Sequence, residues 1–147
     1  MRKLIKNFLN KEEIEELSKI PVLGHTKASK AQGIPKKIID KVIEETGVSL
    51  HDRSNFFTFN RKSGNKWHQD TGLAKLQRHR MPWCKIGISI LLRDCDWGGE
   101  LYYADDDKET NKVKLERGVG DLCFHSSDEW HMVTPHSGER LAFLAFL

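Results

Sequence analysis

A histidine and an aspartate two residues apart, His68 and Asp70, could bind a metal ion from one face of an extended chain. Side chains alternate between the two faces of a β-strand, so residues at this spacing point the same way. A second imidazole from a distant strand, that of His131, would add another nitrogen ligand. Two histidines and one carboxylate, with coordination positions left open, are typical of non-haem Fe(II) sites that react with O2.

An arginine that follows His131 by nine residues, Arg140, could hold an acidic co-substrate through two parallel hydrogen bonds. It precedes an apolar segment, 141–147, where burying a guanidinium group is costly unless an anion meets it. The alternative is a structural ion pair with Glu139 or Asp121. For His68 and Asp70 the corresponding alternative is a hydrogen-bonded pair on the surface.

The composition is that of an ordinary globular domain. The chain has 147 residues, of which 38% are hydrophobic and 31% are charged, enough for one domain with a single core. Its three cysteines lack Cys-x-x-Cys spacing, so we expect neither a disulfide framework nor a structural zinc site, and a cytoplasmic location. The segment 141–147 is too short to cross a bilayer, and the first nine residues lack a signal-peptide core, so no membrane partner is expected.

Charge is distributed unevenly along the chain. Residues 51–95 hold nine Lys and Arg against three Asp, whereas residues 96–147 hold five basic and eleven acidic residues. If the basic segment flanks the metal site, it could attract acidic substrates. The alternative is a solvated loop whose charges only keep it soluble.

Two helices are expected in the N-terminal third. Asn10 and Glu13 have the spacing of a capping box, and the helix that they begin is expected to stop before Pro21. A second apolar stripe predicts a helix over 36–45, with Gly47 as its C-cap. The segment between them, 24–33, is polar and typical of a loop.

From residue 56 onward the pattern is that of short strands separated by Gly, Pro and Asp. About eight strands are expected, over 56–60, 67–70, 86–92, 100–103, 113–115, 121–124, 131–134 and 140–146. Helices followed by a run of strands predict a mainly β (α+β) protein, a helix-buttressed β-sandwich of the jelly-roll kind.

The chain resembles the Fe(II)- and 2-oxoglutarate-dependent oxygenases, within them the prolyl 4-hydroxylase-like branch. The resemblance covers about residues 56–147 and rests on four motifs in the family's order: His-Gln-Asp at 68–70, Trp-Gly-Gly-Glu-Leu at 97–101, Gly-Asp-Leu-Cys-Phe at 120–124 and His-Met-Val-Thr-Pro-His-Ser-Gly-Glu-Arg at 131–140. It implies a double-stranded β-helix, a cupin-like barrel, as a single domain over 1–147. Residues 1–50 would give helical support and residues 51–147 the barrel core.

The resemblance also assigns roles. It selects His131 over the nearby His125 and His136, because His131 has the family's spacing to Arg140. His68, Asp70 and His131 would then hold Fe(II), and Arg140 would bind the distal carboxylate of 2-oxoglutarate. The implied reaction consumes O2 and 2-oxoglutarate, hydroxylates a C–H bond and releases succinate and CO2, with ascorbate as a supporting reductant. A carboxylate at position 70 favours hydroxylation over halogenation.

The sequence departs from the family's pattern at one position, and another region offers candidates for substrate contact. The family often adds a tyrosine hydroxyl to the co-substrate carboxylate, from the strand before His-x-Asp, but residues 56–61 contain no tyrosine. Thr58, Asn60, Tyr102 or Tyr103 could substitute. In the family the region corresponding to 73–83 commonly covers the substrate, which makes its basic side chains candidates for substrate contact: Lys75, Arg78, His79 and Arg80.

The primary substrate is left open, with peptidyl proline one possibility and other proteins, peptides or small molecules the rest. A non-oxidative metal-binding barrel of the cupin type is the alternative from another class. A nucleic-acid-modifying oxygenase that uses the basic segment 51–95 is a further alternative, without an aromatic-interleaved basic motif to support it. Because the chain ends directly after the last expected strand, we expect a monomer.

Overall fold

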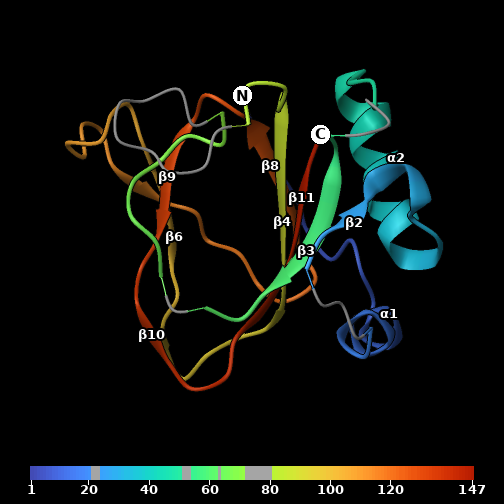
Figure 1. The fold of residues 1–147 in the computed structure, drawn as a ribbon. Helices are drawn as coiled ribbons and strands as arrows, with labels where there is room; N and C mark the ends of the chain where they lie inside the picture. Colours follow the sequence, from blue (N-terminus) through green and yellow to red (C-terminus); the bar gives the residue numbers. More distant parts are fainter. Residues whose placement is uncertain (21–23, 51–53, 63, 72–80) are drawn as a thin grey trace.

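The computed structural model describes residues 1–20, 24–50, 54–62, 64–71 and 81–147 and has two facing β layers (Figure 1). In the described part of the chain the larger layer is a six-stranded sheet of the order β1-β8-β4-β11-β3-β2. Its strands are β1 (Arg2–Ile5), β8 (Leu122–Ser126), β4 (Ile86–Arg93), β11 (Leu141–Phe146), β3 (Phe56–Asn60) and β2 (Thr26–Lys27). All neighbours in this sheet are antiparallel.

The opposite layer is made of shorter strands. A three-stranded sheet has the order β7-β6-β9, and a two-stranded ribbon pairs β10 with β5. Their bounds are β5 (Trp97–Gly98), β6 (Leu101–Ala104), β7 (Val113–Lys114), β9 (Trp130–Val133) and β10 (His136–Ser137). Figure 1 shows β6, β9 and β10 facing the larger sheet, and the helices lying on the outside of that sheet.

One face of the larger sheet packs against the helices, and the other faces the barrel interior. In β4 the side chains of Ile86, Ile88 and Ile90 belong to the core shared with the helices, whereas Gly87 and Ser89 line an interior pocket. The same alternation holds in β11: Phe143 and Ala145 face the helices, while Ala142, Leu144 and Phe146 line the pocket. Because strand side chains have a period of two, each strand contributes to both the core and the site.

Both helices follow their local signals. Helix α1 (Lys11–Ser18) has the capping box: the Asn10 side chain accepts from the Glu13 amide at 2.8 Å, and the Glu13 side chain accepts from the Asn10 amide at 3.1 Å. Helix α2 (Gly33–Thr46) starts three residues earlier than predicted, because Pro35 fits in a first turn, where no amide donor is needed. Gly47, at φ 72°, is its left-handed C-cap.

Helical support was predicted for residues 1–50, and this segment contains both α1 and α2. This segment also contains β1, β2 and a 3-10 turn, η1 (Ala28–Lys30). Strand β1 pairs with β8 and β2 pairs with β3, so both complete edges of the larger sheet. Such pairings depend on backbone edges that come from distant parts of the chain, and local periodicity does not report them.

The predicted strand over 67–70 is not regular either. There the structure has a single bridge between His68 and His131, with both backbone hydrogen bonds at 3.0 Å. No helix in the described part of the chain is both long and apolar enough to cross a membrane.

Candidate active site

The bridge between His68 and His131 brings the two predicted histidine ligands together. The residues exchange both backbone hydrogen bonds, and their ring centroids lie 4.2 Å apart. His131 lies on β9 of the smaller sheet, whereas His68 lies on the segment that runs beside it. Two residues further along this segment, Asp70 is buried, with 4% of its surface exposed.

Backbone carbonyl groups fix the tautomers of both rings. Nδ1 of His68 donates to the Lys66 carbonyl at 2.8 Å, and Nδ1 of His131 donates to the Glu129 carbonyl at 2.9 Å. Since a carbonyl can only accept, the hydrogen of each neutral ring is on Nδ1, and each Nε2 offers a lone pair. Such outer hydrogen bonds are a regular feature of metal-ligating histidines.

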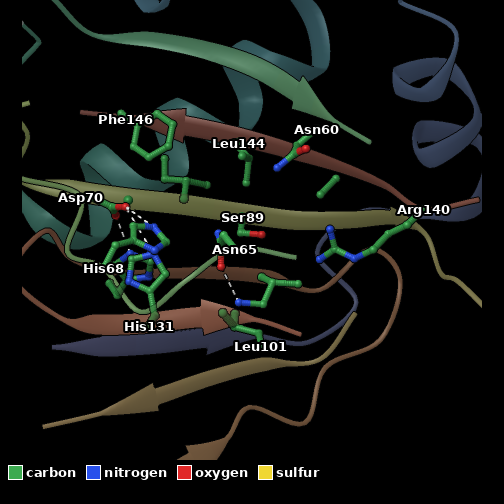
Figure 2. A pocket seen from close by; sticks show the side chains of 15 residues that line it. Asn60, Asn65, His68, Asp70, Ser89, Leu101, His131, Arg140, Leu144 and Phe146 are labelled. Carbon is green, nitrogen blue, oxygen red and sulfur yellow. Dashed lines mark hydrogen bonds and ion pairs between the residues drawn. The ribbon is translucent and has the colours of Figure 1, made fainter. Parts of the chain in front are cut away.

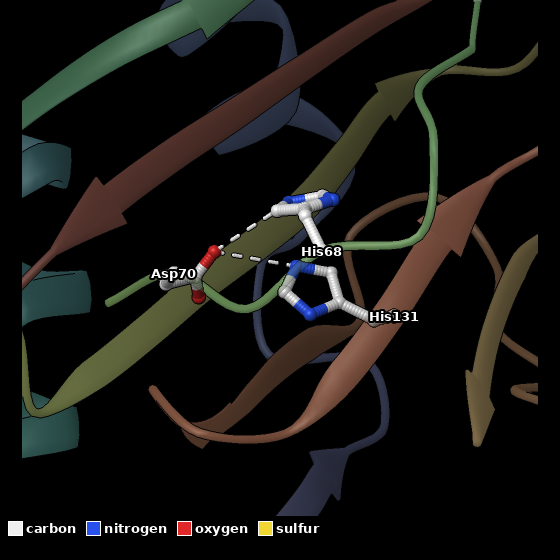
Figure 3. Close-up of side chains that lie close together, drawn as sticks. All are labelled: His68, Asp70 and His131. Atoms are coloured by element: carbon white, nitrogen blue, oxygen red, sulfur yellow. Dashed lines mark ion pairs between the residues drawn. The ribbon is translucent and has the colours of Figure 1, made fainter. Parts of the chain in front are cut away.

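The three side chains converge on one small volume (Figure 3). Oδ1 of Asp70 lies 3.3 Å from Nε2 of His131 and 3.7 Å from Nε2 of His68. One ligand atom from each residue lies within 4.8 Å of the other two. Two imidazole nitrogens and one carboxylate oxygen therefore face a common point, which is the donor set of a facial Fe(II) site.

The electrostatic environment favours the protonation states that bind metal. Burial opposes ionisation of Asp70, but the neighbouring His131 and His125 lower the pKa of its carboxyl well below its usual range. Burial, followed by the neighbouring His131, lowers the pKa of His68. An ionised carboxylate and a neutral imidazole are the forms that coordinate a cation.

Arg140 lies at the other end of the same pocket, directly before β11 (Figure 2). It is 4% exposed, and its Nε atom is buried without a hydrogen-bond partner among the residues that the structure describes. In the described part of the chain no carboxylate forms an ion pair with it: Glu139 pairs with Arg93, and Asp121 pairs with Lys6. Burial, followed by the nearby Arg117, lowers the pKa of Arg140. The structural ion pair considered from the sequence is therefore not formed.

Apolar side chains line the pocket between these two ends. Its walls include Leu101, Val133, Ala142, Leu144 and Phe146. Figure 2 shows His68, Asp70 and His131 gathered at one end and Arg140 extending into the pocket from the opposite end. This arrangement suits a small dianion whose head chelates a metal and whose far carboxylate meets a guanidinium group.

The structure separates the candidates for a second co-substrate anchor. Asn60 lines the pocket. Thr58 does not line it and donates its hydroxyl hydrogen to the Gly24 carbonyl at 3.0 Å. Tyr102 also lies outside the lining and donates to Glu100 at 2.9 Å, so Thr58 and Tyr102 are not placed for this role. Tyr103 is buried and does not line the pocket, and its hydroxyl lies 2.8 Å from Nδ1 of His125.

A residue that sequence reasoning missed, Ser89, is better placed than these hydroxyls. It lines the pocket from the inner face of β4, and its Oγ accepts from Nη1 of Arg117 at 2.8 Å. The hydroxyl hydrogen of Ser89 is then left for an acceptor in the pocket. Its alternation with Ile88 and Ile90 was a signal for an inward position. The proposed substrate contacts Lys75, Arg78 and Arg80, with His79, lie outside the described residues.

Comparison with known proteins places the fold. No protein-family model matches the chain, and no curated protein matches it in sequence. Among solved structures, it is similar to a prolyl-4-hydroxylase from Pseudomonas putida, with a TM-score of 0.69 and 16% identity over 99% of this chain and 83% of that one. It is also similar to a viral collagen prolyl hydroxylase from Paramecium Bursaria Chlorella virus-1 in its 2OG complex, with a TM-score of 0.58 and 16% identity over 99% of this chain and 94% of that one.

A third similar structure is a prolyl hydroxylase from Trichoplax adhaerens in complex with a hypoxia inducible factor peptide fragment, with a TM-score of 0.61 and 16% identity over 99% of this chain and 82% of that one. At these identities the likeness is one of fold. It confirms the predicted mainly β architecture, and the chain therefore has the double-stranded β-helix fold of the prolyl 4-hydroxylase structures.

Proposed function

We propose that this protein is an Fe(II)- and 2-oxoglutarate-dependent dioxygenase of the prolyl 4-hydroxylase-like branch. The observation that carries the proposal is one pocket with two different ends. His68, Asp70 and His131 form a facial donor set at one end, and at the other lies the buried guanidinium group of Arg140, which has no ion pair with any described residue. A co-substrate with a metal-chelating 2-oxo acid head and a distal carboxylate satisfies both ends at once.

The residues of the pocket have separate tasks in this reaction. His68, Asp70 and His131 would hold Fe(II), and Arg140 would orient 2-oxoglutarate through its distal carboxylate, with Ser89 and Asn60 as neighbouring polar contacts. Bound by these residues, Fe(II) would supply the chemistry that divides O2 between the two substrates, with one oxygen atom going to succinate as CO2 leaves 2-oxoglutarate and the other going to a substrate C–H bond. The apolar walls keep bulk water from the charged groups and so strengthen their interactions with the co-substrate. Ascorbate would keep the iron reduced.

The buried charge of Arg140 separates this proposal from a non-oxidative metal-binding barrel. Metal binding alone does not require a desolvated guanidinium group at the opposite end of the pocket. Burying such a charge without a partner is unfavourable, so its presence indicates an anionic ligand. The nucleic-acid alternative depends on the basic segment 51–95, of which Arg53, Lys75, Arg78 and Arg80 lie outside the described residues.

For the primary substrate we propose a peptide that contains proline. The support is the likeness to three prolyl hydroxylase structures, one of which is in complex with a peptide fragment. The test combines the purified protein with Fe(II), ascorbate, 2-oxoglutarate, O2 and a set of proline-containing peptides. Succinate is measured by chromatography, and the gain of one oxygen atom in a peptide is measured by mass spectrometry.

The expected result is succinate formation that requires Fe(II) and O2 and is lost in the His131→Ala variant. Hydroxylation that peptide fragmentation locates on proline would identify proline as the target, whereas succinate without a modified peptide would support the oxygenase and reject this substrate class. The oxygenase proposal fails if the reconstituted protein neither binds 2-oxoglutarate under anaerobic conditions nor converts it when O2 is added.

A further inference from the structure

The two oxygen atoms of Asp70 have different surroundings. Oδ1 faces Nε2 of His131 at 3.3 Å and Nε2 of His68 at 3.7 Å. Oδ2 points away from them and lies 2.6 Å from Nε2 of a third histidine, His125 on β8. His125 was expected from the sequence to lie outside the ligand set, and it is buried, with 5% of its surface exposed.

His125 is held from its other side as well. The Tyr103 hydroxyl on β6 lies 2.8 Å from Nδ1 of His125. Burial raises the pKa of Tyr103, so its phenol stays protonated and donates to Nδ1. The hydrogen of a neutral His125 ring is then on Nε2, where it is donated to the carboxylate of Asp70. One chain of hydrogen bonds therefore runs from Tyr103 through His125 to Asp70.

A glycine on the neighbouring strand makes room for this contact. Gly87 pairs with His125 in the register of β4 and β8. A Cβ atom at position 87 would lie 2.1 Å from Oδ2 of Asp70 and 2.6 Å from Nε2 of His125. Any larger residue at position 87 would clash with this contact. Gly87 on β4, Tyr103 on β6 and His125 on β8 therefore all contribute to the hydrogen bond at one oxygen of Asp70.

We infer that His125 is a positioning residue that keeps Asp70 a ligand through one oxygen only. The inference rests on the proposed function and adds to it. A six-coordinate metal with two histidines and one carboxylate oxygen has three positions left, two for a chelating 2-oxo acid and one for O2. If Asp70 bound through both oxygens, one of these positions would be lost. Engaging Oδ2 in a short hydrogen bond prevents this.

The test compares variants of His125 with metal-free protein and Co(II) as the probe, because Co(II) allows binding to be measured without turnover. His125→Phe removes the hydrogen bond, and His125→Gln can restore a donor to Oδ2. Loss of such an outer contact typically weakens metal binding about 10- to 100-fold. We expect a change in this range for His125→Phe and a smaller change, within about threefold, for His125→Gln. His25→Gln, at an exposed histidine outside the pocket, is the control.

A second readout separates positioning from general structural damage. In Co(II)-saturated His125→Phe, 2-oxoglutarate should bind less tightly than in the wild type, because the freed Oδ2 competes for a coordination position. Tyr103→Phe removes only the hydroxyl that orients His125, so it should weaken Co(II) binding in the same direction by a smaller factor. If His125→Phe does not fold, His125→Gln and Tyr103→Phe are each compared with the wild type. Co(II) affinity close to that of the wild type in His125→Gln, together with weaker Co(II) binding in Tyr103→Phe, supports the inference.

The inference is overturned if His125→Phe binds Co(II) and 2-oxoglutarate like the wild type. It is equally overturned if His125→Gln is as impaired as His125→Phe. This test can be distinguished from the test of the proposed function. If the variants show this pattern of Co(II) affinities but the protein never forms succinate, the positioning role of His125 is supported and the oxygenase reaction is rejected.

Discussion

Replacement of Arg140 by methionine tests the two ends of the pocket separately. Arg140 is buried and has no ion pair in the described structure, so its charge is available for the distal carboxylate of 2-oxoglutarate. Removing one partner of a buried, hydrogen-bonded charge pair costs about 2–5 kcal/mol. At about 1.4 kcal/mol per factor of ten, the dissociation constant of 2-oxoglutarate should rise roughly 30-fold to 4,000-fold.

The same substitution should leave the metal site intact and should not destabilise the protein. Since no described residue forms an ion pair with the buried guanidinium group and its Nε atom has no hydrogen-bond partner there, a methionine of similar length removes a desolvation penalty and keeps the packing. We therefore expect the free energy of unfolding of the metal-free variant to equal or exceed that of the wild type. The affinity for Co(II) should change less than threefold, about 0.7 kcal/mol.

Isothermal titration of Co(II)-loaded protein with 2-oxoglutarate measures the dissociation constant of 2-oxoglutarate. Urea denaturation of the metal-free protein measures the free energy of unfolding. Arg93→Met is the matched control, because it removes a positive charge whose partner is the exposed Glu139. This control should bind 2-oxoglutarate like the wild type. The reasoning is refuted if Arg140→Met changes 2-oxoglutarate affinity less than fivefold or loses Co(II) and 2-oxoglutarate in equal measure.

Three further predictions concern His131, Gly87 and Asp121. His131→Ala removes a proposed metal ligand and should lose both Co(II) and 2-oxoglutarate binding; retention of Co(II) would contradict this role. Gly87→Ala places a Cβ atom 2.1 Å from Asp70, so urea denaturation should show a loss of about 1–3 kcal/mol and titration a weaker Co(II) site, whereas wild-type values in both would count against the geometry. Although burial opposes its ionisation, Asp121 has a pKa below its ordinary 3.8, because the amides of Asn7 and Gly118 and the ammonium group of Lys6 contact its carboxylate. A carboxyl group whose pKa is lower in the folded than in the unfolded protein stabilises the fold at pH values above its unfolded-state pKa. This stabilisation is lost as the pH falls through its folded-state pKa. Asp121→Asn should therefore be less stable than the wild type by about 1–3 kcal/mol at pH 7, and the difference should shrink below about pH 4; a difference independent of pH would contradict this assignment.

The elements with local signals were predictable from the sequence. The capping box at Asn10 and the left-handed cap at Gly47 depend on neighbours within a few residues, and both are confirmed. The β3 strand has the predicted bounds, Phe56–Asn60, because its aromatic run has strong strand propensity. The two-residue strands β2, β5 and β10 were missed, since each exists only through pairing with a distant partner.

The sequence by itself determined the chemical types of the site: two imidazoles, one carboxylate and one guanidinium group, in an order and spacing that indicated a metal and an acidic co-substrate. The tertiary structure decided which of these groups meet. A single bridge between His68 and His131, not a strand, brings the two proposed histidine ligands together, and the absence of an ion pair to Arg140 within the described residues leaves its charge for a ligand.

The structure also chose between side chains that the sequence left equivalent. Thr58 and Tyr102 form hydrogen bonds outside the pocket, whereas Asn60 and Ser89 line it. His125 forms a hydrogen bond with Asp70. The physical reason is that a period of two determines the face on which a residue lies, but not its neighbour across the barrel. That neighbour follows from the register of strands far apart in the chain, which only the closed fold determines.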